Sequence, residues 1–161
     1  MSVENASDNF PRWTIPRRER MGEQNLHISA FNVVRKGAND NALMFVRAGP
    51  KFPVSFKRDK WLLPAAIMDF GEKPKDVAKR VLTEQIANVE YLVLNYLSMQ
   101  SYLGAHWDIV FIFESILDNT KPAPVAKEPF VGLTFHKLDS LPRHEIAEDH
   151  LEVLDELRKE L

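Results

Sequence analysis

The stretch that decides the fold is LLPAAIMDFGEKPKDVAKRVLTEQIANV, residues 62–89. Its first apolar run stops at Pro64, because proline cannot donate a hydrogen bond to a neighbouring strand. A tight loop containing Gly71 follows, and Pro74 suits the first position of a helix. Apolar residues then recur every three to four positions, as in an amphipathic helix: Val77, Ala78, Val81, Leu82 and Ile86. The stretch predicts a short buried strand, a loop and a helix over residues 74–87.

The segments on either side of this stretch predict further strands and a second helix. Residues 27–34 and 42–47 are rich in β-branched and aromatic residues, and the polar turn between them predicts a hairpin. Three more strands are predicted after the first helix, at 89–97, 107–116 and 130–138. An apolar stripe with acidic residues near its start and basic residues near its end predicts a last helix at about 144–160. The order β-β-β-α-β-β-β-α indicates a mixed α/β (α+β) fold.

Length and composition predict one globular domain. A chain of 161 residues with 45% hydrophobic residues can bury a sizeable core. Residues 1–26 carry a basic cluster and little apolar periodicity, so we expect an N-terminal extension before a domain at 27–161. The basic cluster is typical of a solvated surface, with a partner-binding arm as the alternative.

Charge and cysteine content exclude several classes of protein. The chain has no cysteine, which excludes a disulfide scaffold, a thiol nucleophile and a cysteine-ligated zinc site. A net charge of -2 does not favour nucleic-acid binding. The sequence contains neither a secretory signal nor an apolar run long enough to span a bilayer. We therefore expect a soluble, cytoplasmic protein with no membrane partner.

The loop and helix of residues 62–89 resemble the Nudix (MutT-like) hydrolase family. The family's box reads Gly, five residues, Glu, seven residues, then Arg-Glu-apolar-any-Glu-Glu-any-Gly-apolar. In one ungapped register, the matching positions here are Glu72, Arg80, Leu82 and Glu84. The resemblance extends from about residue 27 to the C-terminus. It implies a Nudix-type α/β/α sandwich with a mixed central sheet, and catalytic roles for Glu72, Arg80 and Glu84.

The same register shows that the box is degenerate. Non-matching residues occupy its two glycine positions, two of its glutamate positions and its last apolar position: Ala66, Val81, Gln85, Ala87 and Asn88. A glycine in the loop can adopt positive φ and bring its carbonyl close to a metal ion, which alanine does only with strain. Both the loop and the helix of the implied metal site are therefore altered.

The implied metal-binding face of the helix has lost most of its charge. Positions 81, 84, 85 and 88 share one face of a continuous helix, and the resemblance implies that active relatives place carboxylates there for Mg²⁺ or Mn²⁺. Hard divalent cations need anionic oxygen ligands. Glu84 is the carboxylate that remains at these positions, beside Val81, Gln85 and Asn88. We expect weak or absent metal binding at Glu84 and no cofactor, with Mg²⁺ or Mn²⁺ needed if the protein is active.

Ordinary structural roles account for several of the same residues. Arg80 and Glu84 have the spacing of a surface ion pair worth about 0.3–0.5 kcal/mol. Val81 is most economically a core residue. Asp69 and Gln85 are further candidate ligand-binding residues. Glu114 is another, because a carboxylate within an apolar strand needs a partner or a function if it points inward.

Three functions fit these observations. The first is a catalytically impaired Nudix-fold protein that binds a nucleotide-like or phosphorylated small ligand, or a protein partner. The second is a divergent pyrophosphohydrolase acting on a nucleoside diphosphate linked to another moiety, with Asp69 or Glu114 supplying further acids. The third is a structural, ribosome-associated subunit, which the near-neutral charge disfavours. The resemblance also leaves a homodimer open.

Overall fold

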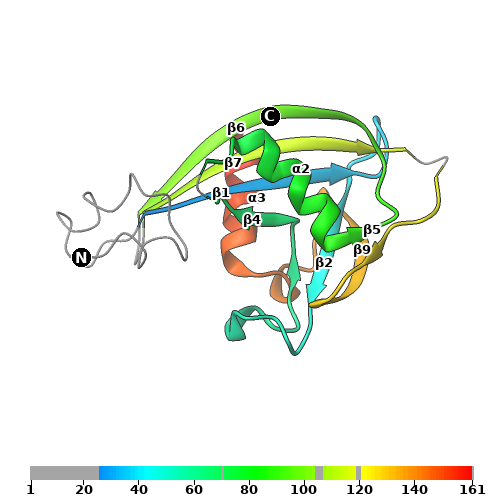
Figure 1. Ribbon diagram of the computed structural model, residues 1–161, viewed down its shortest axis with the longest axis horizontal. Helices are drawn as coiled ribbons and strands as arrows, with labels where there is room; N and C mark the ends of the chain where they lie inside the picture. The colour runs from blue at the N-terminus through cyan, green and yellow to red at the C-terminus, as the bar shows by residue number, and fades with distance from the viewer. Residues whose placement is uncertain (1–25, 70, 104–106, 119–120, 161) are drawn as a thin grey trace.

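A computed structural model of the chain describes residues 26–69, 71–103, 107–118 and 121–160 (Figure 1). The predicted N-terminal extension, residues 1–26, lies outside these residues except for Leu26, where the first strand begins.

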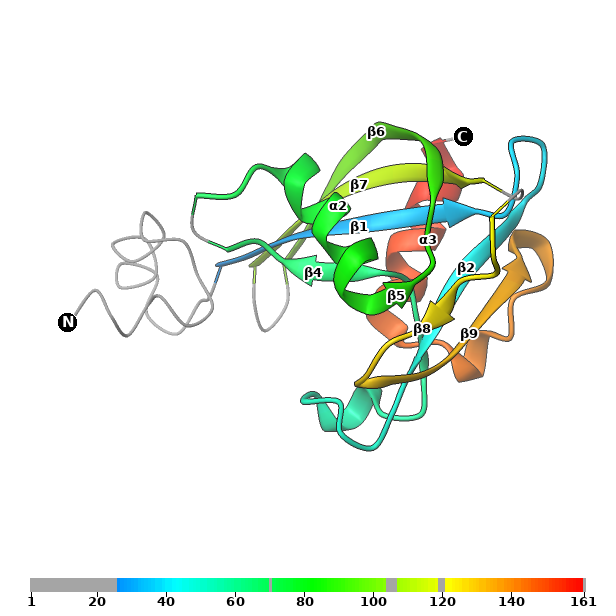
Figure 2. The same ribbon diagram turned by 45° about the vertical axis from the view of Figure 1, so that its right-hand side comes forward.

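The described chain forms a mixed sheet with one α-helix on each face (Figure 1, Figure 2). The strands of the main sheet are β1 (Leu26–Arg35), β2 (Ala42–Ala48), β3 (Trp61–Leu62), β4 (Ala65–Ile67), β6 (Tyr91–Leu103), β7 (Trp107–Leu117) and β9 (Phe130–Lys137). A small second sheet pairs β5 (Ile86–Ala87) with β8 (Val125–Ala126). The helices are α2 (Pro74–Gln85) and α3 (Glu148–Glu160), with short 3-10 turns η3 (Ser55–Lys57), η4 (Leu138–Ser140) and η5 (Arg143–Glu145).

The strand order of the main sheet is β3-β2-β1-β7-β6, with β4 also paired to β1 and β9 to β2. The pairing of β1 with β7 is parallel and the other pairings are antiparallel. Because side chains alternate along a strand, the two faces of β1 pack against different helices. Ile28 and Ala30 lie in a cluster with Val77 of α2, whereas Phe31 and Val33 lie in a cluster with Leu154 of α3. The predicted fold class and the sheet between two helices are confirmed.

Some predicted boundaries were wrong, and long-range contacts explain why. Helix α2 ends at Gln85 instead of residue 87, because Ile86 and Ala87 pair with β8. The last helix begins at Glu148 instead of 144, since the chain first forms η5 and then bridges Trp61 at Ile146. Strand pairing also resumes after Pro64, as β4, where the sequence predicted an end.

No helix within the described residues is both long enough and apolar enough to cross a membrane.

Candidate functional site

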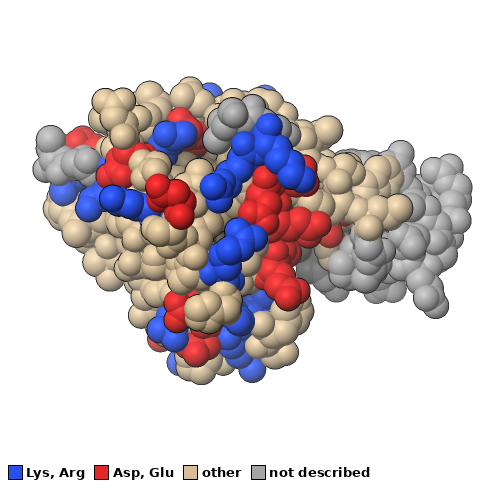
Figure 3. Space-filling model, turned by 180° about the vertical axis from the view of Figure 1, so that it is seen from behind, with Lys and Arg blue, Asp and Glu red and all other residues tan. Residues whose placement is uncertain are grey.

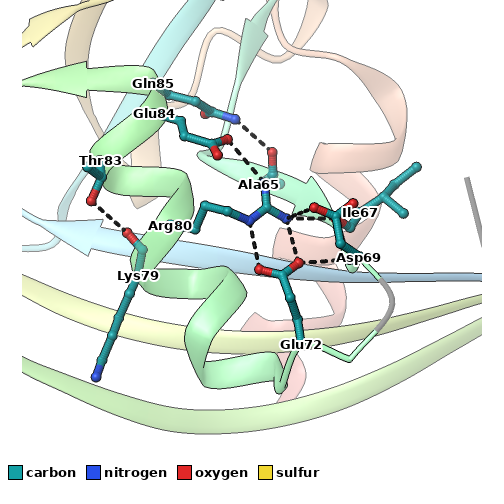
Figure 4. A network of polar contacts seen from close by, with 9 residues as sticks. All are labelled: Ala65, Ile67, Asp69, Glu72, Lys79, Arg80, Thr83, Glu84 and Gln85. Atoms are coloured by element: carbon teal, nitrogen blue, oxygen red, sulfur yellow. Dashed lines mark hydrogen bonds and ion pairs between the residues drawn. The ribbon is translucent and has the colours of Figure 1, made fainter. Parts of the chain in front are cut away.

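The box segment lies where β4, the following loop and helix α2 meet (Figure 4). Gly71 has φ of 86°, in the left-handed region, so the predicted tight turn does require a glycine at this position. The turn brings the carboxylate of Glu72 next to the guanidinium of Arg80, which points from α2 toward the loop (Figure 4).

Arg80 is the centre of the polar contacts in this segment. Its Nε donates to Glu72 Oε2 at 2.8 Å and its Nη2 to Glu72 Oε1 at 2.9 Å, which makes a bidentate pair. Nη2 also donates to the carbonyl of Ile67 at 3.0 Å, and Nη1 to Glu84 Oε2 at 3.1 Å. The Asp69 carboxylate lies 3.7 Å from Nη2. The structure therefore brings three predicted residues, Asp69, Glu72 and Glu84, together around the guanidinium of a fourth, Arg80.

The two glutamates bound to Arg80 differ in environment. The Glu72 side chain is 20% exposed and that of Glu84 is 56% exposed. The hydrogen bonds from Arg80 hold the pKa of Glu72 below its ordinary value, assisted by the backbone N–H of Asp69, although burial opposes the shift. In return, Glu72 raises the pKa of Arg80. Glu72 is thus ionised and links the loop to the helix through Arg80, whereas Glu84 lies at the surface.

The implied metal-binding face does not exist as one helical surface. Val81 is fully buried in the cluster between α2 and the sheet, as predicted for a core residue. Asn88 lies beyond the end of α2 with φ of 59°, so the predicted common face of positions 81, 84, 85 and 88 was wrong. Gln85 remains beside Glu84, and its Nε2 donates to the carbonyl of Ala65 at 2.9 Å.

The side chains of Glu84 and Gln85 do not form a ligand set that fits Mg²⁺ or Mn²⁺. Glu84 is bound to a guanidinium, whose positive charge would repel a cation, and the Gln85 side chain directs a hydrogen-bond donor at the Ala65 carbonyl. Within the part of the chain that the structure describes, no three His, Asp or Glu residues lie together in a group that could hold a metal ion.

Glu114 lies away from the other predicted site residues. Val110, Ile112 and Glu114 lie at alternate positions along β7, so their side chains lie on the same face of the sheet. Val110 and Ile112 pack in the cluster that contains residues of α3. The Glu114 carboxylate accepts a hydrogen bond from Arg35 Nε at 2.9 Å. Glu114 therefore has the partner that its position in an apolar strand required, on the face of the sheet opposite α2.

A cavity of about 490 Å³ opens beside Gln85, and the sequence did not predict its phenylalanine lining. Strands β1 and β4, the connection between β2 and β3, and the start of α3 contribute to its lining. Four phenylalanines line the cavity: Phe31, Phe52, Phe56 and Phe130. The ring centroids of Phe52 and Phe130 are 5.4 Å apart. The sequence did contain one signal of this cavity, because Phe52 and Phe56 lie in a proline-containing connection. Large apolar side chains in such a connection indicate that it packs over another part of the molecule.

The polar side chains of this cavity form two close pairs. Lys57 Nζ lies 2.6 Å from Asp149 Oδ2, and His27 Nδ1 lies 3.4 Å from Asp108 Oδ1. His150 is fully enclosed, and burial lowers its pKa to about 4, so the imidazole is neutral at pH 7. Its Nδ1 accepts a hydrogen bond from the backbone N–H of Leu63 at 2.9 Å, which leaves the ring proton on Nε2. The cavity is therefore mainly apolar, and the lysine in its lining is already paired with a carboxylate.

Comparison with known proteins identifies the fold. No protein-family model and no curated protein matches the chain. Among solved structures, the MutT protein from Methanosarcina mazei Go1 has a TM-score of 0.67 at 13% identity, over 86% of this chain and 96% of that one. The MutT Nudix hydrolase from Burkholderia pseudomallei has a TM-score of 0.62 at 14% identity, over 82% and 98%.

A third structure contains ligands. The bifunctional NMN adenylyltransferase/ADP-ribose pyrophosphatase from Francisella tularensis, complexed with AMP and a Mn ion, has a TM-score of 0.63 at 15% identity. The match covers 92% of this chain and 46% of that chain. With these structural matches and the sheet described above, the protein has the fold of the Nudix hydrolases.

Proposed function

We propose that the protein is a catalytically impaired Nudix-fold protein that binds a nucleotide-like ligand without a metal ion. The observation that carries this proposal is the hydrogen bond from Gln85 Nε2 to the Ala65 carbonyl. In a metal-dependent site a cation joins a carboxylate of the helix to oxygen atoms of the loop. Here an amide N–H makes that connection directly, which a glutamate cannot do, because an ionised carboxylate has no donor.

The lining of the cavity supports a ligand with a flat, apolar group. Phe52 is partly exposed and Phe56 is exposed, so both rings of the lining are accessible to a nucleobase, and stacking on an aromatic ring is worth about 1–3 kcal/mol per base. The nearby cation, Lys57, is already paired with Asp149. We therefore propose that the base and sugar supply most of the binding free energy and that a phosphate group adds little. The AMP in the Francisella structure is consistent with this ligand class.

Calorimetric titration of adenosine, AMP and ADP-ribose, each with and without Mn²⁺, tests the proposal. We expect adenosine and AMP to bind with similar affinity, no change on adding Mn²⁺ or EDTA, and no release of AMP from ADP-ribose. Phe52→Ala should weaken adenosine binding by about tenfold, the equivalent of about 1.4 kcal/mol. Val125→Ala is the control, because Val125 is an exposed residue outside the cavity lining. Mn²⁺-dependent hydrolysis of ADP-ribose would instead establish a divergent pyrophosphohydrolase.

Restoring the lost carboxylates provides a second test. In Val81→Glu/Gln85→Glu, the carboxylate at position 85 would lie beside Glu84, whereas the one at position 81 would lie in the same turn of α2 but face the core. Mn²⁺ should therefore bind more tightly than to the wild type, chiefly through positions 84 and 85. The buried carboxylate at position 81 should cost several kcal/mol of stability, and Mn²⁺ should recover part of it as a higher Tm. If Mn²⁺ raises the wild-type Tm as much as that of the double variant, the wild-type site still binds metal and the proposal fails.

A further inference from the structure

Strand β6 forms an edge of the main sheet and carries no charged residue. It is the last strand in the order β3-β2-β1-β7-β6, so within the described residues its outer edge pairs with no other strand (Figure 2). Its 13 residues read YLVLNYLSMQSYL, without Lys, Arg, Asp, Glu or proline. Exposed strand edges in native proteins are usually blocked by charged residues or proline, because their unpaired backbone groups can bind another chain. The composition of β6 therefore leaves its edge open to pairing.

An apolar surface lies next to this edge. Leu92, Tyr96, Met99 and Leu103 of β6 are all more than half exposed. By the strand register, Met99 lies opposite Phe111 and Leu103 opposite Trp107 on β7, and both partners are only partly buried. Helix α2 packs mainly over β1, so it leaves this part of the sheet face uncovered. Edge and face together make an uncharged and largely apolar strip, which we call the β6 strip.

The second half of β6 is the regular half. The register with β7 shifts between Tyr91 and Val93 and again between Tyr96 and Ser98. Such bulges disturb the pairing edge of a strand. From Ser98 to Leu103, every residue pairs in step with β7. This half is therefore the part best able to accept a further strand.

We infer that the β6 strip is a homodimer interface, in which β6 of a second copy pairs antiparallel to it across a two-fold axis. A two-fold axis places each surface against itself, so any charge near the axis would face the same charge on the other copy. An uncharged strip satisfies this condition, whereas the side of the molecule seen in Figure 3 carries many Lys, Arg, Asp and Glu side chains.

The strip offers both a pairing edge and a sheet face. Its regular part, from Ser98 to Leu103, extends over about 20 Å, at roughly 3.3 Å per residue. A standard protein interface buries about 800 Å² per partner, so the dimer has to bury the exposed side chains of the face together with the edge. The dimer would extend the sheet from one copy into the other and leave the cavity beside Gln85 outside the interface.

Molecular mass in solution tests this inference. We expect the full-length wild type to sediment as a dimer at micromolar concentration and Met99→Lys/Leu103→Lys to weaken dimerisation at least a hundredfold, because each copy brings two ammonium groups to the pairing edge. Val131→Lys is the matched control, since Val131 is an exposed apolar residue on β9. Unchanged adenosine binding by the lysine variants would show that they fold. A wild type that stays monomeric at about 100 µM overturns the inference.

Disulfide trapping locates the interface independently of affinity. The chain has no cysteine, so Met99→Cys and Ser101→Cys each introduce a single thiol on an exposed position of β6. Mild oxidation should give a covalent dimer for at least one of them, because antiparallel pairing brings residues near the axis next to their own copies. Val131→Cys should give none. Equal trapping at Val131 and on β6 would point to random collision and count against the inference.

Discussion

The two helices hold the same segment, residues 61–67, by different means. From α3, His150 Nδ1 accepts the N–H of Leu63 at 2.9 Å, and just before that helix the N–H of Ala147 donates to the carbonyl of Trp61 at 3.1 Å. These contacts are closed off from solvent, since Leu63, Ala147 and His150 are all buried.

From α2, the contacts come from longer side chains that remain partly in solvent. Gln85 binds the Ala65 carbonyl and Arg80 binds the Ile67 carbonyl. The α3 end of the segment is thus fixed by a neutral ring inside the core, and the α2 end by an amide and a guanidinium near the surface. This difference predicts that the α3 anchor contributes mainly to stability, whereas the α2 anchor can change its chemistry without loss of the fold.

The largest effect is expected from His150→Ala. The variant leaves the buried N–H of Leu63 without an acceptor and removes a ring that contacts Phe31, with centroids 4.8 Å apart. We expect a loss of about 3–4 kcal/mol in the free energy of unfolding, measured by urea denaturation. His150→Asn should recover part of that loss, because the asparagine oxygen can accept the same N–H. If the alanine variant loses less than Gln85→Ala, the contrast between the helices is wrong.

The pH dependence of stability is expected to be almost as large. Burial lowers the pKa of His150 from 6.5 to about 4, so between these values the unfolded chain binds a proton that the folded chain does not. The contribution of His150 is therefore complete above pH 6.5 and falls by about 3 kcal/mol as the pH decreases to 4. Urea denaturation at pH 7.5, 6 and 5 should show a steeper loss for the wild type than for His150→Asn. Parallel curves would contradict the lowered pKa.

A smaller effect is expected from Arg80→Ala. The variant removes both hydrogen bonds to Glu72, whose side chain is partly buried, and we expect a cost of about 2 kcal/mol. Glu84→Ala removes an exposed i,i+4 partner of the same guanidinium and should cost about 0.3–0.5 kcal/mol. Thermal melts of the two variants would compare them directly. Equal losses would mean that Arg80 acts through its surface pair and not through Glu72.

Local patterns in the sequence were sufficient for most of the fold. The apolar periodicity of α2 placed Val77 and Val81 in the core, where both are fully buried. The errors arose where a distant partner decides the structure. Pro64 has no N–H, but its carbonyl accepts the N–H of Asn32, so the chain stays beside β1 and pairing resumes as β4. Asn88 left the predicted helical face because pairing with β8 ends α2 earlier.

The candidate site could be predicted only in part. Spacing along the sequence grouped Glu72, Arg80 and Glu84 correctly, because they lie on one loop and one helix. Alternation along β7 could place Glu114 with Val110 and Ile112, but not show which helix covers that face. The cavity joins a connection, two strands and the start of α3, and no local pattern encodes such an arrangement.

An effect smaller than that of Arg80→Ala tests the α2 anchor itself. In Gln85→Glu without metal, two oxygen acceptors face each other where the amide now donates to the Ala65 carbonyl. The free energy of unfolding should fall by about 1 kcal/mol. The loss is limited because Gln85 is partly exposed, and because its buried Oε1 has no hydrogen-bond partner among the described residues that the substitution could remove.

Gln85→Met is the matched control, since it keeps the length of the side chain and removes both polar atoms, and it should cost less than Gln85→Glu. Millimolar Mn²⁺ should raise the Tm of Gln85→Glu and leave those of Gln85→Met and the wild type unchanged, because only a carboxylate beside Glu84 gives a cation two anionic ligands next to a carbonyl. If Gln85→Glu is as stable as the wild type without metal, then the amide does not anchor the segment. The α2 end of residues 61–67 would then be held by Arg80 alone, and the metal-free connection between helix and loop would lose its support.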